Sequence, residues 1–166
     1  MVPGLLQTGD YARSVIKAGQ PRISTDELER KVASRLERQV IFTREAGRPM
    51  YWVVVHEGVL RHVVGSPDIM RTQLDRLIDS TDLPDIIIQV LPYSASDHPG
   101  TDGPILVFDF ANAPSSGYTE CNGGGMIIEQ PDQVSGLVTS MSLIRAAALS
   151  PRESKRYIVQ ARDEIT

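Results

Sequence analysis

The sequence contains little cysteine, no long apolar run and no block of like charges. Its single cysteine, Cys121, cannot form an internal disulfide or a cysteine-rich zinc site, so packing must stabilise the fold and a reducing compartment is expected. No apolar stretch approaches the roughly 20 residues that a membrane span requires. The first residues lack the basic and apolar regions of a signal peptide. We therefore expect a cytoplasmic protein without a membrane partner.

The charge balance disfavours binding to nucleic acid. The formal net charge is −4 and the sequence pI is about 5.4, whereas non-specific duplex binding depends on Lys and Arg that neutralise phosphates. With 166 residues, 41% of them apolar and 23% charged, the chain has the composition of an ordinary globular protein. We expect a single domain that spans residues 1–166.

Capping residues and apolar periodicity predict several helices. A capping box, Ser24 to Glu27, precedes apolar residues that recur every four positions, which predicts a long helix ending near Arg44. A second box, Ser150 to Glu153, has proline at the first helical position and opens the last helix. The complete set of predicted helices is 9–18, 24–44, 66–78, 131–148 and 151–165.

Runs of β-branched and aromatic residues predict about five strands. The unbroken Ile86 to Ile88 indicates a strand with both faces covered. Two glycine-containing loops, 114–117 and 122–125, are typical of an antiparallel meander. The predicted strands are 50–55, 85–91, 104–110, 117–121 and 126–129. The order predicts an α+β fold: a mixed or antiparallel sheet of about five strands covered by amphipathic helices, with two helices at the C-terminal end.

One short segment carries residue types suited to catalysis or metal binding. His98 with Asp97 or Asp102 could bind zinc or manganese, or serve a small hydrolase. The intervening Pro99 and Gly100 favour a turn instead, because Asp side chains stabilise turns and the spacing matches no known metal-ligand motif.

His56 stands directly before Glu57 at the predicted end of a strand, and the pair could act as a base and the group that orients it. No activated nucleophile accompanies them, so an ordinary strand-to-helix junction is favoured. We predict no catalytic residue, no cofactor and no metal.

Aromatic residues gather in or near the predicted strands and could form the apolar wall of a ligand pocket, although an ordinary aromatic core is the favoured interpretation. They are Tyr51, Trp52, Tyr93, Phe108, Phe110 and Tyr118. The candidate ligand or partner surface consists of Trp52, His56, Tyr93, Asp97, His98, Asp102 and Phe108.

Five separated segments together resemble one family. They are VPGLLQTGDYARSVIKAG, RLERQVIFTR, VVHEGVLRHVVGSPDIMRTQLDRLI, IIIQVLPYSASDHPGTDGPILVFDF and AAALSPRES, in this order. The chain resembles the C-terminal domain that follows an Xre-type helix-turn-helix in many regulators of Streptomyces and related actinobacteria, including WhiJ-like developmental regulators. The resemblance covers almost the whole chain.

This resemblance implies a regulatory domain of a transcription factor and not an enzyme. It implies that an N-terminal helix-turn-helix domain absent from this chain contacts DNA, with Met1 a supplied start. It also implies a small acidic BldB-like partner protein. A small-molecule effector is the alternative ligand. We further expect a homodimer that uses the amphipathic helices 24–44 or 151–165, because an apolar stripe left exposed on a helix favours association.

Overall fold

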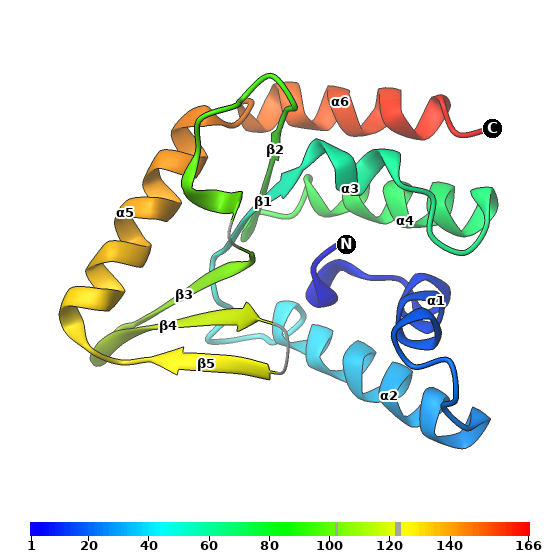
Figure 1. Ribbon diagram of the computed structural model, residues 1–166, viewed down its shortest axis with the longest axis horizontal. Helices are drawn as coiled ribbons and strands as arrows, with labels where there is room; N and C mark the ends of the chain where they lie inside the picture. Colours follow the sequence, from blue (N-terminus) through cyan, green and yellow to red (C-terminus); the bar gives the residue numbers. More distant parts are fainter. Residues whose placement is uncertain (102, 122–123) are drawn as a thin grey trace. The chain divides into compact units, whose positions relative to one another are not determined.

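The computed structural model describes residues 1–101, 103–121 and 124–166, which form two compact units (Figure 1). Unit 1 combines Met1–Val90 with Leu149–Thr166, and unit 2 is Leu91–Ala148. The α+β class is confirmed and the described residues contain five strands, as predicted. The prediction of one sheet is wrong, because two strands pair in unit 1 and three pair in a separate sheet of unit 2.

Unit 1 contains the two-stranded sheet and most of the helices. Its strands are β1 (Tyr51–His56) and β2 (Ile86–Leu91). Its helices are η1 (Gly4–Leu6), α1 (Gly9–Gly19), α2 (Thr25–Glu37), η2 (Arg38–Phe42), α3 (Glu57–Arg61), α4 (Pro67–Ser80) and α6 (Pro151–Asp163).

The two strands of unit 1 are joined by a helical crossover. The backbone N–H of Tyr51, the first residue of β1, donates to the carbonyl of Asp85, just before β2, over 2.8 Å. The beginnings of the strands therefore lie side by side and the strands run parallel, with α3 and α4 between them in the chain. A parallel pair requires such a crossover, because a tight turn cannot return the chain to the same end of the sheet.

The core of unit 1 lies between one face of this sheet and helices α4 and α6. Val53 and Val55 of β1 and Ile86 and Ile88 of β2 are buried there. Their partners from the helices include Met70, Leu74, Leu77, Ile158 and Ala161. Ile87, which points to the other face, is only half-buried, so complete cover of both faces of this strand is not observed.

Side-chain caps begin α2 and α6 where the sequence predicts them. At Ser150 both halves of the capping box are present, and hydrogen bonds from the Ser150 hydroxyl and backbone N–H lower the pKa of Glu153. At Ser24 the hydroxyl accepts from the N–H of Glu27, whose carboxylate also pairs with Lys31 at 3.1 Å.

The predicted long helix after Ser24 ends earlier than expected. Regular α-helix stops at Glu37 and continues as the 3₁₀ helix η2, which leaves Val40 55% exposed. Within η2 the Gln39 amide donates to the carbonyls of Gly4 and Gln7, at 3.2 and 2.7 Å. The apolar residues that recur every four positions therefore predicted too long an α-helix. Where Gln39 contacts the N-terminal segment, the backbone has the tighter 3₁₀ form.

The N-terminal segment is held inside unit 1 by one buried glutamine of α4. Gln73 is completely buried; its Nε2 donates to the carbonyl of Leu6 and its Oε1 accepts from the N–H of Thr8, both over 2.8 Å. The Gln7 side chain is also buried and donates to the carbonyl of Val2. Side-chain amides therefore satisfy backbone groups that have no strand or helix partner.

Unit 2 is an antiparallel meander followed by one long helix. Its elements are η3 (Pro99–Thr101), β3 (Ile105–Phe110), β4 (Ala113–Cys121), β5 (Gly124–Ile128) and α5 (Pro131–Ala147). The predicted loop 114–117 is wrong, because these residues belong to β4 and the chain turns at 111–112, next to an irregularity between Phe108 and Phe110. Of the second predicted turn, 122–125, residues 122–123 lie outside the described residues, and the prediction is wrong for Gly124 and Gly125, which belong to β5.

Helix α5 covers one face of this sheet. Val134 of the helix and Ile128 of β5 are buried. A Cβ atom added at Gly117, in the middle of β4, would lie 2.3 Å from Cδ1 of Leu137. The glycine therefore allows α5 to approach the central strand closely.

Replacement of Gln73 by Ala is expected to lower the free energy of unfolding by about 2–4 kcal/mol, because two buried backbone groups lose their partners. Urea unfolding followed by circular dichroism measures the change. Gln133→Ala, at an exposed position of α5, is the matched control. Equal stabilities of the two variants would contradict the role of Gln73.

Replacement of Gly117 by Ala is expected to lower the free energy of unfolding by about 1–2 kcal/mol, because Leu137 must move. Gly136→Ala in α5 is the control, since its added Cβ meets nothing within 4 Å. That change should be neutral or raise stability by up to about 1 kcal/mol through helix propensity. The same denaturant titration compares them, and a Gly117→Ala variant as stable as Gly136→Ala would refute close packing at this point.

Candidate functional site

The strongest candidate site is the face of the unit 2 sheet opposite α5. Residues paired across antiparallel strands point to the same face, and here Leu106, Tyr118 and Ile127 are paired in one row across the three strands. Phe108 lies two residues after Leu106 on β3 and therefore shares this face. We call Leu106, Phe108, Tyr118 and Ile127 the apolar sheet face.

The apolar sheet face is exposed to an unusual degree. The exposed fractions are 37% for Leu106, 44% for Phe108 and 70% for Ile127. Antiparallel sheets with one packed face normally present polar side chains on the other. Phe110, at the end of β3, is a further 54% exposed. Contiguous exposed apolar groups of this kind mark interaction surfaces in folded proteins.

The Tyr118 ring lies at the centre of this face and covers part of the neighbouring strand, β5. A Cβ atom added at Gly125 of β5 would lie 1.9 Å from the Tyr118 hydroxyl oxygen and 2.2 Å from its Cζ. The ring therefore lies over a glycine that leaves space for it. The Tyr118 hydroxyl donates to Glu120 over 3.2 Å, and Glu120 is the acidic residue on this side of β4. The face is thus flat, aromatic at its centre and acidic at one end.

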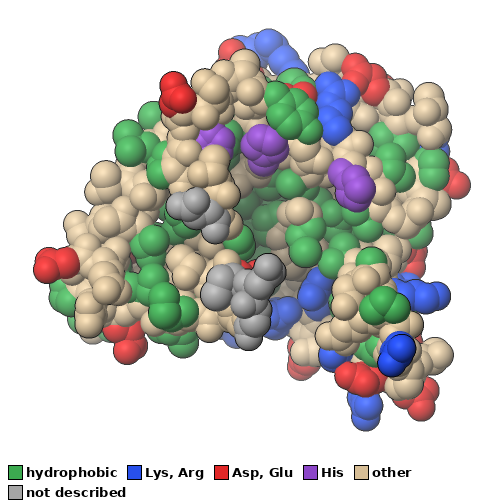
Figure 2. All heavy atoms as spheres, viewed as in Figure 1, with side chains coloured by type: hydrophobic (Ala, Val, Ile, Leu, Met, Phe, Trp, Pro, Cys, Tyr) green, Lys and Arg blue, Asp and Glu red, His purple; other side chains and the backbone are tan. Residues whose placement is uncertain are grey.

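Unit 2 is also poor in charged residues, and nearly all of them are acidic. Residues 91–148 contain six Asp or Glu and a single cation, Arg145, although the whole chain has 17 Lys and Arg. Figure 2 shows green and red side chains, and no blue ones, over α5 at the left of the view. Arg145 belongs to α5, the helix that covers the opposite face of the sheet. The apolar sheet face therefore has a carboxylate nearby and no cation of its own unit.

Both candidate catalytic histidines take part in local turns. Nδ1 of His98 accepts the backbone N–H of Gly100 over 3.1 Å, and Nδ1 of His56 accepts that of Gly58 over the same distance. A Cβ atom added at Gly100 would lie 3.2 Å from Ile144 in α5, so the His98 loop packs against that helix. Within the described ranges no three His, Cys, Asp or Glu residues are placed to hold a metal ion.

The other predicted surface residues do not lie on one sheet. Trp52 is in β1 of unit 1, where its Nε1 donates to Oε1 of Gln89 on β2 over 2.7 Å. Phe108 is in β3 of unit 2. Tyr93 and Asp97 are exposed in the segment after β2, and Asp102 lies outside the described residues. An aromatic wall built on a single sheet is therefore wrong, because Tyr51 and Trp52 belong to a different sheet from Phe108, Phe110 and Tyr118.

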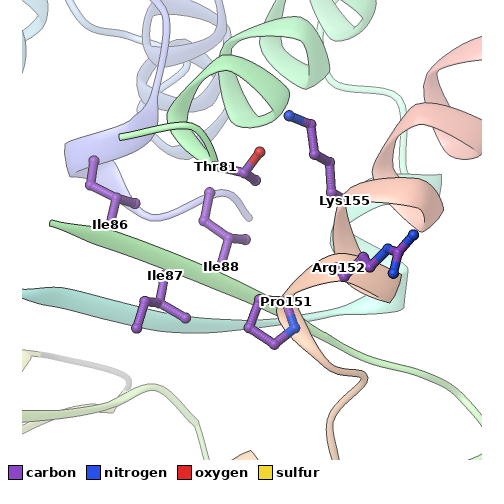
Figure 3. Close-up of a pocket in the computed structure, with 7 residues that line it drawn as sticks. All are labelled: Thr81, Ile86, Ile87, Ile88, Pro151, Arg152 and Lys155. Carbon is purple, nitrogen blue, oxygen red and sulfur yellow. The ribbon is translucent and has the colours of Figure 1, made fainter. Parts of the chain in front are cut away.

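A small cavity in unit 1 lies between β2 and the beginning of α6 (Figure 3). Its volume is about 170 Å³, below the ~300 Å³ at which ligand pockets commonly begin. Its lining consists of Thr81, Ile86, Ile87, Ile88, Pro151, Arg152 and Lys155. Figure 3 shows the Arg152 guanidinium directed away from the isoleucines, and Lys155 pairs with Asp82 at 2.5 Å. The isoleucines form the apolar floor of the cavity, and the hydroxyl of Thr81 in its lining already donates to the carbonyl of Ile78.

Of the four residues of the apolar sheet face, the predicted ligand or partner surface contained Phe108, and the predicted aromatic wall contained Phe108 and Tyr118. Leu106 and Ile127 belong to predicted strands. The alternation of side chains along a strand, however, does not show which face of the sheet packs on a helix and which is exposed. The usable signal was the charge distribution, since a segment with one cation in 58 residues contains three strands. Such a segment has few charged side chains that could make an exposed sheet face polar.

Comparison with known proteins assigns a family and no activity. The model of a family described as a domain of unknown function (DUF5753) matches residues 1–160, so the chain belongs to that family. No curated protein and no solved structure matches. In the part of the chain that the structure describes, no helix has the length and apolar character to cross a membrane.

Replacement of His98 by Ala is expected to change the free energy of unfolding by less than about 1 kcal/mol, because it removes one partly exposed turn bond. Elemental analysis of the purified protein should detect no metal that depends on this residue. His56→Ala, which removes the equivalent bond in the other unit, is the control. Stoichiometric zinc or manganese that is present in the wild type and lost in His98→Ala would contradict the assignment to a turn.

Proposed function

We propose that this member of the DUF5753 family is a non-enzymatic regulatory domain that acts by binding another protein through the apolar sheet face. The observation that carries the proposal is a sheet with one face packed on α5 and the other apolar and exposed, with Ile127 at 70%. An enzyme that used His98 is disfavoured, because that imidazole caps a turn and packs with its loop against α5.

The wider context of the proposal comes from the family resemblance. The domain would belong to a cytoplasmic Xre-type transcriptional regulator in which another segment reads DNA. A partner that binds one arrangement of the domain more tightly would shift the population of the regulator toward that arrangement. The net charge of −4 agrees with a domain that leaves DNA contacts to another segment.

The proposed acidic BldB-like partner would bind unit 1 more readily than unit 2. Unit 1 is almost neutral, with 16 Lys and Arg against 15 Asp and Glu, whereas unit 2 has one cation against six acidic residues. Electrostatic complementarity suppresses contact between surfaces of like charge. If the proposed homodimer forms, it would need surfaces other than the main helix stripes, because Leu28 and Val32 of α2 and Ile158 of α6 are buried within unit 1.

A small-molecule effector is a weaker candidate than a protein. The cavity of about 170 Å³ in unit 1 is small, and its cations point away or are paired. A wider hollow of about 310 Å³ in unit 2, between the beginning of β4 and the beginning of α5, has Glu129 as the one charged residue of its lining. A flat apolar sheet face offers a ligand of drug size little enclosure, but it offers a protein the large, complementary area that such interfaces need.

Incorporation of the photo-crosslinker benzoylphenylalanine at Phe108 is expected to join the chain to another protein when it is expressed in its own host cells. The same crosslinker at Leu143, 56% exposed on α5, is the control. A second substitution, Ile127→Glu, should remove the adduct formed from position 108. Absence of adducts at 108, or identical adducts from 108 and 143, would overturn the proposal.

A further inference from the structure

The chemistry of the apolar sheet face also restricts its partner, provided that the proposed function holds. The face consists of two aromatic and two aliphatic side chains, and its centre is the Tyr118 ring that covers Gly125. A partner must therefore offer apolar side chains to displace water from this surface. Flat aromatic surfaces also suit the stems and charged heads of Lys and Arg, which combine apolar contact with charge.

The charges around the face favour a cationic partner. Glu120 lies on the same side of β4 as Tyr118, and its carboxylate accepts a hydrogen bond from the Tyr118 hydroxyl. The unit as a whole has six acidic residues and one cation, and that cation is on the helix that covers the other face. Unit 2 therefore has a net negative charge, and Glu120 places one carboxylate on the face itself, so that a positively charged partner would be attracted to the unit before contact.

The same charges disfavour a second copy of this chain on the face. Two copies docked through it would bring together two acidic units, each with a single cation that belongs to the helix of the opposite face, and like charges at an interface oppose association. An anionic lipid surface or a nucleic acid is disfavoured for the same reason.

We propose that the apolar sheet face binds a cationic, apolar segment of another protein, one in which hydrophobic residues alternate with or flank Lys or Arg. The hydrophobic side chains would pack on Phe108, Tyr118 and Ile127, and a Lys or Arg would approach Glu120. Affinity would come mainly from the apolar contact, while the charge would select among segments of equal hydrophobicity.

Selection of random 12-residue peptides displayed on phage against the whole 166-residue protein tests this. Selected peptides should be enriched in Lys and Arg together with large apolar residues. For a selected peptide, Phe108→Ser or Ile127→Ser should weaken binding by at least about tenfold, as loss of a central contact does. Glu120→Lys should weaken it by about 2–5-fold, as expected for one exposed ion pair.

Two controls make the result specific. Leu143→Ser, on α5, should leave the affinity unchanged, and far-ultraviolet circular dichroism must show that each variant keeps its fold. Peptides that require Phe108 or Ile127 but have no excess of Lys or Arg would overturn the cationic partner and leave the proposed function standing. Peptides that bind equally to the Phe108, Ile127 and Leu143 variants, or a selection that yields none, would overturn both.

Discussion

The organisation of unit 2 depends on a mismatch between one helix and a sheet with two apolar faces. A three-stranded antiparallel sheet needs cover for each apolar face, and α5 covers the face that contains Gly117 and Ile128. The other face retains Phe108 and Ile127 at 44% and 70% exposure. Removal of such side chains from water contributes about 25 cal/mol for each Å² of apolar area, so a partner that covers them gains affinity directly.

Unit 1 differs because its sheet, helices and N-terminal segment share one core. Gln73 bonds the backbone at Leu6 and Thr8, and Tyr11 receives the N–H of Val2 on its hydroxyl, so the first residues are fixed from two sides. Burial raises the pKa of Tyr11, so its hydroxyl stays neutral in the core. The family match over residues 1–160 includes this N-terminal segment, and hydrogen bonds to the buried Gln7 and Gln73 make the segment part of the core. The N-terminal segment of unit 1 is therefore bonded into its core, whereas unit 2 exposes the apolar sheet face.

The sequence predicted the elements better than their assembly. Helix starts at Ser24, Ser66 and Ser150 were predictable because a cap is a local signal. The pairing of the strands was not predictable, because strands 51–56 and 105–110 have similar compositions. Their division between two sheets depends on contacts distant in sequence, such as the hydrogen bond from Tyr51 to Asp85. Pro114 and Gly117 predicted a loop over residues 114–117. In the structure Gly117 lies inside β4, where its missing side chain leaves space for Leu137. At the site, Phe108 and Tyr118 were predicted, whereas Leu106 and Ile127 join them through cross-strand register that the sequence does not reveal.

The central claim, that another protein covers the apolar sheet face, is tested most directly by hydroxyl-radical footprinting of this chain, purified and inside its host cells. The account predicts that Phe108, Tyr118 and Ile127 react readily in the purified protein and are protected in the cells, while Tyr93, exposed outside this face, reacts equally in both. Equal reactivity of the three face residues in the two preparations would contradict it.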